Sequence, residues 1–598
     1  MTRSLDLAPI GNCSVSALID RQGRFVWCCA PRVDADPFFS NLLATAEPDE
    51  PDAGGHWSIE VEGSTQVRQA YLRNTAVLRT EITDAAGQVA EILDFAPRFR
   101  MYGRGYRPVA FVRLIRPVLG SPHVTIRVRP TCDWGREACP ATYGSNHLRF
   151  IGQDITLRLT TNAPVSQVRE ERSFRLEEPI ALFLGPDEPF QGDVRSTTDA
   201  MLADTCAYWR EWVRTLALPL EWQEAVIRAA IALKLCVYEE TGAIVAALTT
   251  SIPEAPRSGR NWDYRFCWLR DAYYVVQALN RLSAADILEN YLGYLRNIVD
   301  KANGGHVQPV YGVGYEPILK ERIVDSLPGY QGMGPVRVGN QAHEHVQHDV
   351  YGQIVLSNVQ AFFDERLLRP ATLADFEALE KLGERAFLLH DQPDAGIWEL
   401  RTRAEVHTYS AVMCWAACDR LANAAERLGQ RARAKVWTER AAVIRQTIET
   451  KAWCEERGHF AASFGGDAVD ASLLQMVDVR FLRPDDPRNR ATLAAVEKHL
   501  RRGSNLLRYD RPDDFGAPET AFNFCTFWYI EALHLAGRAD EARALFEEML
   551  GRRTHAGLLS EDAALGDGTL WGNYPQTYSL VGLINCAVLL SRPWSSVR

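Results

Sequence analysis

The first third of the chain alternates apolar and polar residues, which is the pattern of a β-strand with one buried face. The alternating segments are separated by Gly, Pro, Asn and Asp, which favour turns. Several short strands at close spacing predict an antiparallel β-sandwich, which we expect over residues 1–200. The segments are 56–63, 75–85, 88–97, 107–118, 123–130 and 154–162.

Beyond about residue 221 the pattern becomes helical, with apolar residues at i, i+3, i+4 and i+7. Residues 201–220 are expected to form a linker helix between the two regions. Twelve helical segments follow, centred in 221–239, 262–282, 285–303, 345–364, 372–389, 408–429, 431–453, 470–482, 490–501, 520–538, 540–550 and 574–591.

The helical segments differ in how much of their surface is apolar. AFNFCTFWYIEALHLAG (521–537) is apolar nearly all round, so it should be buried on both sides, whereas RARAKVWTERAAVIRQTIE (431–449) is amphipathic. This alternation indicates two concentric layers, and twelve helices fit an (α/α)6 barrel over residues 221–598. An irregular α-solenoid is the alternative, but it needs a repeat of about 30–45 residues that the sequence does not show.

Composition narrows the classes of function. The chain of 598 residues has 66 Lys and Arg against 76 Asp and Glu, so its net charge is −10. Such an acidic chain is a poor candidate for binding a nucleic acid. No apolar run is long enough for a membrane helix and no leader pattern is visible, so we expect no membrane partner and a cytoplasmic location. The 13 Cys lack metal-site spacing, and we expect free buried thiols in a reducing compartment.

Five polar, aromatic-rich segments are expected at the mouth of such a barrel. The first, 257–279, places Trp262, Arg270 and Asp271 near the start of a helix. Aromatic rings can stack on sugar rings, and an Arg–Asp pair can bind neighbouring hydroxyls through charge-assisted hydrogen bonds. The alternative interpretation is an aromatic core helix that begins with a salt bridge.

The second segment contains three histidines, His343, His345 and His348. A metal site is disfavoured because His343 and His348 are five residues apart, whereas the histidines of an HExxH helix face are four apart. The favoured interpretation is a polar rim that presents Gln347 and Asp349 to a ligand.

The other segments supply candidate carboxylates. Glu399 follows Trp398, and burial against a large ring would raise its pKa, as a general acid requires; an ordinary exposed Glu is the alternative. Arg508 precedes a very apolar helix. Glu561 lies on a loop that could place a general base opposite Glu399.

These segments together resemble glycoside hydrolase family 15, the glucoamylases and their trehalase and glucodextranase relatives. The organisation is most similar to that of the bacterial trehalase-like branch, and the resemblance covers essentially the whole chain. It implies an N-terminal β-sandwich followed by an (α/α)6 catalytic barrel. The motifs are IGNCSVSALIDRQGRFVWCCAPRVDADPFF (10–39), RNWDYRFCWLRDA (260–272), PVRVGNQAHEHVQHDVYG (335–352), GIWELR (396–401), LLSED (558–562) and LWGNYPQTYSLVGLI (570–584).

The resemblance also implies roles for individual residues. Glu399 matches the general acid and Glu561 the general base. Leu400 follows the acid where many members have a second acidic residue, which bears on the linkage that is cleaved. The chemistry implies no metal and no cofactor. The residues that match glucose-binding positions or pocket walls are Arg270, Asp271, Arg508, Trp262, Trp398 and Trp571.

The implied activity is exo-acting, inverting hydrolysis of a small α-glucoside, with release of β-glucose from the non-reducing end. Trehalose is the favoured substrate, and malto- or isomalto-oligosaccharides are the alternative. Inversion needs the two carboxyl groups about 6.5–9.5 Å apart, because a water molecule must fit between them and the sugar. A phosphorylase or a non-catalytic sugar-binding protein is disfavoured because both glutamates are present.

Overall fold

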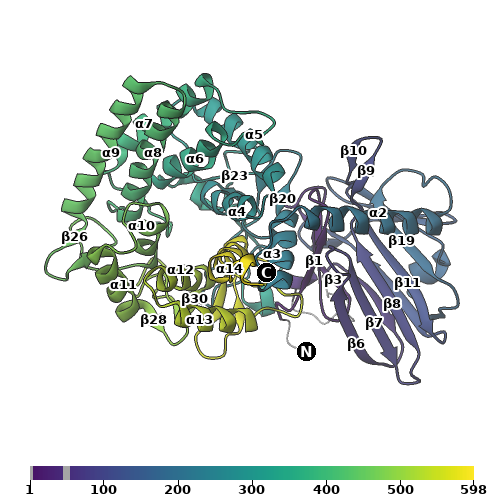
Figure 1. Ribbon diagram of the computed structural model, residues 1–598. Helices are drawn as coiled ribbons and strands as arrows, with labels where there is room; N and C mark the ends of the chain where they lie inside the picture. The colour runs from purple at the N-terminus through teal and green to yellow at the C-terminus, as the bar shows by residue number, and fades with distance from the viewer. Residues whose placement is uncertain (1–3, 45–53, 598) are drawn as a thin grey trace.

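The computed structural model describes residues 4–44 and 54–597. Residues 1–3, 45–53 and 598, which the predictions for residues 1–200 and 221–598 include, lie outside the described part. Figure 1 shows sheets in the N-terminal region, in purple and blue, and a group of helices in the C-terminal region, in teal to yellow. No helix in the described ranges combines the length and apolar character needed to span a bilayer.

In the described part of the N-terminal region, the two largest sheets are antiparallel and have seven and eight strands. The order is β1-β2-β3-β5-β12-β18 in the first, with β4 beside β3, and β15-β16-β17-β19-β11-β8-β7-β6 in the second. The first sheet consists of β1 (Ala8–Gly11), β2 (Ser16–Ile19), β3 (Phe25–Cys29), β4 (Pro37–Phe39), β5 (His56–Val61), β12 (His123–Arg129) and β18 (Phe174–Arg175). The second consists of β6 (Ser64–Tyr71), β7 (Leu78–Asp84), β8 (Val89–Phe95), β11 (Phe111–Leu119), β15 (Ala141–Tyr143), β16 (His147–Ile151), β17 (Thr156–Thr161) and β19 (Ile180–Pro186).

Side chains from both sheets share one buried cluster. In β7 every second residue from Leu78 to Asp84 is buried, which confirms the alternation predicted there. The ring of Phe25, in the first sheet, lies 5.1 Å from Trp57 of the same sheet and 5.6 Å from Phe111 of the second. Burying rings of this size removes a large apolar area from water and holds the two sheets together.

A long helix, α2 (Val194–Arg214), connects the two regions and packs on β19 and on β9 (Phe99–Met101). It begins at Val194 because Asp193 caps it: the Asp193 carboxylate accepts a 2.8 Å hydrogen bond from the backbone N–H of Ser196. The predicted bounds of the linker helix, 201–220, are therefore wrong at both ends.

Each of the twelve predicted helical segments overlaps a helix, although α11 and α13 extend beyond the predicted bounds. The helices are α3 (Gln223–Leu235), α4 (Leu269–Arg281), α5 (Ala285–Ala302), α6 (Asp349–Val359), α7 (Leu373–Leu389), α8 (Thr408–Arg427), α9 (Arg431–Lys451), α10 (Gln475–Asp478), α11 (Pro487–Leu500), α12 (Asn523–Leu535), α13 (Ala539–Gly551) and α14 (Thr577–Leu590).

Six of these helices contact one another in a closed circle. The circle runs from α4 to α6, α8, α10 with the 3-10 turn before it (Ala471–Leu474), α12, α14 and back to α4. Each of the other six helices contacts a member of this circle. Asn523–Ile530 of α12 are all buried, whereas α9 buries one stripe, so both predicted degrees of burial are confirmed.

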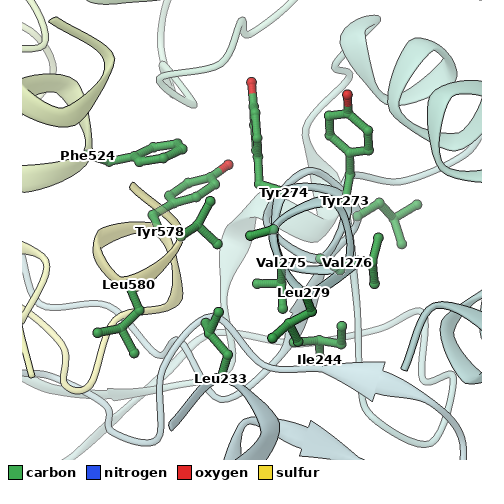
Figure 2. Packing of buried hydrophobic residues seen from close by; sticks show 14 of the residues in the cluster. Leu233, Ile244, Tyr273, Tyr274, Val275, Val276, Leu279, Phe524, Tyr578 and Leu580 are labelled. Atoms are coloured by element: carbon green, nitrogen blue, oxygen red, sulfur yellow. The ribbon is translucent and has the colours of Figure 1, made fainter. Parts of the chain in front are cut away.

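Figure 2 shows how α4 packs against its neighbours. The ring of Tyr274 lies 5.4 Å from that of Phe524 in α12 and 5.6 Å from that of Tyr578 in α14. Phe524 and Tyr578 stack on each other with ring centroids 4.3 Å apart. Tyr274 thus connects three members of the circle, α4, α12 and α14.

The cysteines depart from the prediction in one place. Cys132 and Cys139 form a disulfide, with their Cα atoms 5.5 Å apart, so the expectation of a free thiol is wrong for both. The short antiparallel pair β13 (Thr131–Cys132) and β14 (Glu137–Ala138) brings them together. The remaining eleven cysteines are free, and ten of these are buried.

Candidate active site

One pocket of about 930 Å³, open to solvent, is lined by the segments that precede α4, α6, α8, α12 and α14. These helices belong to the closed circle, so the segments before them converge on one end of it. Seven of the eight predicted site residues line this pocket: Trp262, Arg270, Asp271, Trp398, Glu399, Arg508 and Glu561.

Glu399 lies on the segment between α7 and α8 with a left-handed backbone, φ 58°, which is uncommon for a residue other than glycine. Its Oε1 accepts three hydrogen bonds, from Trp268 Nε1 at 2.7 Å, Arg270 Nη2 at 3.1 Å and Gln347 Nε2 at 3.2 Å. Its Oε2 has no hydrogen-bond donor within the described ranges. The side chain is 23% exposed. One oxygen is therefore fixed by donors, and the other is free to carry a proton.

Glu561 lies between α13 and α14 and is only 1% exposed. Its Oε1 accepts a 2.6 Å hydrogen bond from the Tyr264 hydroxyl, and its Oε2 accepts one of 3.3 Å from the backbone N–H of Asn573. Gly572 makes this approach possible: a Cβ there would lie 2.6 Å from the Glu561 Cβ, and the backbone φ is +74°. The carboxylate is thus enclosed by its own loop.

Burial raises the pKa of Glu561 well above its usual range, and the neighbouring carboxylates of Glu254 and Asp562 raise it further. The Tyr264 hydrogen bond and the charge of Arg508 act in the opposite direction. Burial also raises the pKa of Asp562, to about 7. A proton is therefore held more tightly here than by an exposed glutamate.

Glu254, which the sequence did not single out, holds two of the predicted residues in place. It is buried and pairs with Arg508, and its Oε1 accepts a 2.8 Å hydrogen bond from Trp262 Nε1. No motif marked this residue, because nothing in the sequence around it shows that it faces a loop 254 residues further along the chain.

Arg270 contacts protein groups with all three guanidinium nitrogens. Besides the bond to Glu399, its Nε donates to the Tyr578 hydroxyl at 2.9 Å and its Nη1 to Gln347 Oε1 at 2.8 Å. The neighbouring Asp271 lines the pocket, and burial raises its pKa to about 7 although the charge of Arg270 lowers it. Arg270 therefore orients the candidate acid.

The histidine-rich segment does not form the predicted rim. Gln347 and Asp349 are buried and do not line the pocket; Gln347 bonds to Glu399 and Arg270, and Asp349 lies 3.5 Å from Arg270. The member that lines the pocket is His345, whose two ring nitrogens are shielded and have no partner within the described ranges. Within residues 4–44 and 54–597, no group of three or more His, Cys, Asp or Glu side chains could hold a metal ion.

The three predicted tryptophan walls separate into two groups. Trp262 and Trp398 line the pocket, and Trp398 Nε1 donates a 2.8 Å hydrogen bond to Asp470. Trp571 does not line it, so its assignment as a wall is wrong. Its ring is buried and makes a T-shaped contact with Tyr330, 6.2 Å between centroids.

Comparisons with known proteins agree over both regions. The sequence profile described as glycosyl hydrolases family 15 matches residues 222–588, and the profile described as trehalase-like, N-terminal, matches residues 5–175. A protein named trehalase from Mycolicibacterium smegmatis is 31% identical over 98% of this chain and 91% of its own length. Another named trehalase, from Thermoplasma volcanium, is 31% identical over 97% of this chain and 92% of its own length.

A solved structure supports the fold. A bacterial glucoamylase complexed with acarbose superposes with a TM-score of 0.67, covers 98% of this chain and 94% of its own, and is 14% identical. At that identity the likeness concerns the arrangement of the elements and carries no information on the substrate.

Proposed function

Because the chain belongs to glycosyl hydrolase family 15, we propose that it is an exo-acting, inverting α-glucoside hydrolase whose substrate is trehalose. The observation that carries the proposal is the pair of glutamates in one pocket, each held by different donors. Glu399 has one oxygen fixed and one free, and Glu561 is enclosed and held by Tyr264.

The proposal includes the architecture around this pocket. The closed circle of helices and the helices packed against it support an (α/α)6 barrel that begins near α3. The two sheets with a common buried cluster support a β-sandwich that ends before Asp193. Helix α2 then serves as the linker between the two domains.

In the proposed reaction Glu399 gives the proton on its Oε2 to the oxygen between the two sugars, and the bond from that oxygen to the anomeric carbon breaks. Glu561 takes a proton from a water molecule, whose oxygen bonds to the anomeric carbon from the opposite face. Each glutamate thus ends in the protonation state in which the other began. Proton exchange with solvent restores both.

The preference for trehalose rests on two relatives that are named trehalase. Both match this chain along nearly their whole length. A disaccharide places its second glucose next to the acid, and there the pocket presents Leu400 and His345.

The deciding experiment is a glucose-release assay on trehalose, maltose, isomaltose, kojibiose and nigerose, with the product anomers read by proton NMR at early times. Inverting hydrolysis of trehalose yields one β-glucose and one α-glucose. Two α-glucose molecules would contradict Glu561 as the base for water. Glucose from maltose or isomaltose but not from trehalose would favour the oligosaccharide alternative.

A further inference from the structure

A second cavity, of about 1540 Å³, lies where the N-terminal sheets meet the helical region. We call it the junction cavity. It is lined by residues 70–74 at the end of β6 and beyond, by the end of α2, by the first turns of α3 and by residues 553–557. None of its lining residues lines the pocket that holds Glu399 and Glu561.

The junction cavity contains four arginines that form no ion pair. Arg73, Arg214, Arg228 and Arg553 all line it, and none lies within 4.0 Å of a carboxylate oxygen in the described part of the chain. Of the lining residues only Glu224 is acidic. In a chain with a net charge of −10, this is a local excess of positive charge.

Two of the arginines are half-buried and fixed by neutral groups. Arg228 stacks on the ring of Tyr71, 3.5 Å from its centroid, and its Nη2 donates to the backbone oxygen of Thr75 at 3.0 Å. Arg553 donates its Nε to the backbone oxygen of Leu550 at 2.8 Å. Burial lowers the pKa of both arginines, because no full counter-charge offsets the loss of water around them.

The remaining guanidinium nitrogens of these two arginines have no protein acceptor in the described ranges, and they are not shielded from solvent. Arg73 and Arg214 reach the same cavity from exposed positions. Guanidinium groups present their N–H donors in a planar fork that matches the oxygens of a phosphate.

We propose that the junction cavity binds a phosphate-bearing anion, either inorganic phosphate or a phosphate monoester such as a sugar phosphate. A phosphate carries about two negative charges near neutral pH and has at least three acceptor oxygens. It therefore supplies both the counter-charge and the acceptors that the four arginines lack.

The bound anion would connect two parts of the molecule. Arg73 lies in the connection between β6 and β7, whereas Arg553 begins the segment that continues to Glu561. That segment already packs closely on Arg228, since a Cβ at Gly557 would lie 3.2 Å from the Arg228 Cγ. Binding is thus expected to slow hydrogen exchange in residues 70–74 and 553–561.

The test is calorimetric titration of the full chain with inorganic phosphate and, separately, with glucose 6-phosphate, at constant ionic strength. We expect a Kd of about 1 mM or below for at least one of them, and the arm that binds more tightly identifies the source of the phosphate. The double variant Arg73→Gln/Arg214→Gln should weaken binding at least about tenfold, because it removes two of the four positive charges. Both substitutions are at exposed positions.

The matched control is Arg195→Gln/Arg210→Gln, which removes two exposed arginines of α2 that also form no ion pair and lie outside the cavity. The control should bind as the unaltered chain does. The proposal is overturned if neither anion binds, if both double variants bind equally, or if the slowed hydrogen exchange lies elsewhere. Because inorganic phosphate carries no sugar, the outcome of that titration is independent of the proposed hydrolase activity.

Discussion

Glu399 and Glu561 carry the same chemical group into the same pocket, but their surroundings differ. Glu399 is partly exposed on a turn with positive φ, and Trp268, Arg270 and Gln347 all donate to one of its oxygens. Glu561 is fully enclosed, with one phenolic and one amide donor on separate oxygens.

The difference separates two ways of preparing a carboxyl group for proton transfer. Donors on one oxygen of Glu399 leave the other as the place for its proton. Burial raises the pKa of Glu561, which makes it a stronger base once it is ionised but requires a higher pH for ionisation. The sequence predicted that Glu399, the candidate acid, would be the buried carboxyl group. In the structure the more deeply buried one is Glu561, the candidate base.

The largest effect is expected from Glu561→Gln, because the water then has no base. Hydrolysis of trehalose and of α-glucosyl fluoride should both fall by about 10²- to 10⁴-fold, measured as kcat/KM. Binding of glucose, followed by tryptophan fluorescence, should persist. Retention of more than a few per cent of the activity would contradict the assignment of the base.

The second effect, from Glu399→Gln, should depend on the leaving group. Hydrolysis of trehalose should fall by about 10²- to 10⁴-fold, since its leaving oxygen needs a proton. Fluoride leaves without one, so hydrolysis of α-glucosyl fluoride should be largely retained. Equal losses on both substrates would mean that Glu399 has a role other than proton donation.

A smaller effect concerns the acidic limb of the pH profile. Glu254→Gln removes a negative charge that raises the pKa of Glu561, so that pKa should fall and activity should extend to lower pH. The profile of kcat/KM measures this limb for the free enzyme.

The matched control is Asp513→Asn, which removes another pocket carboxylate that is not among the main causes of the Glu561 shift. Its acidic limb should stay in place. A Glu254→Gln profile that only falls in height, without moving along the pH axis, would reduce Glu254 to a support for Arg508 and Trp262.

The smallest effect is expected from Trp268→Phe, which keeps an aromatic ring but removes the 2.7 Å donor to Glu399. The value of kcat on trehalose should fall about tenfold, while KM and the rate on α-glucosyl fluoride change little. Trp398→Phe is the control, since its Nε1 donates to Asp470 and not to the acid. A larger loss of kcat in Trp398→Phe than in Trp268→Phe would mean that the hydrogen bond from Trp268 does not support the acid.

The secondary structure could be predicted from the sequence more fully than the site could. The helical segments after residue 221 were visible because an apolar period of 3.6 residues is a local property, and Asn523–Ile530 are buried as predicted. The start of α2 was missed because one side chain, Asp193, sets it, although capping residues are readable in principle. The disulfide was missed because two cysteines seven residues apart match no cysteine motif that the sequence analysis considered.

In the site, too, the placement of single residues could not always be predicted from the sequence. Seven of the eight residues that the motifs indicated line the pocket, whereas the eighth, Trp571, packs against Tyr330 outside it. Gln347 and Asp349 look like surface residues in the sequence, yet they are buried beneath the pocket and contact Arg270. Such placement depends on contacts with residues far away in the chain.

The sequence by itself determined the order of the elements, the change from sheet to helix near residue 200, and the presence of two glutamates in loops and of an Arg–Asp pair near a helix start, since these follow from local periodicity and residue type. Only the tertiary structure decided that Glu254 supports Arg508, that Tyr264 holds Glu561, and that four arginines meet in one cavity. The physical reason is that burial and electrostatic interactions depend on distance in space, which local sequence does not encode.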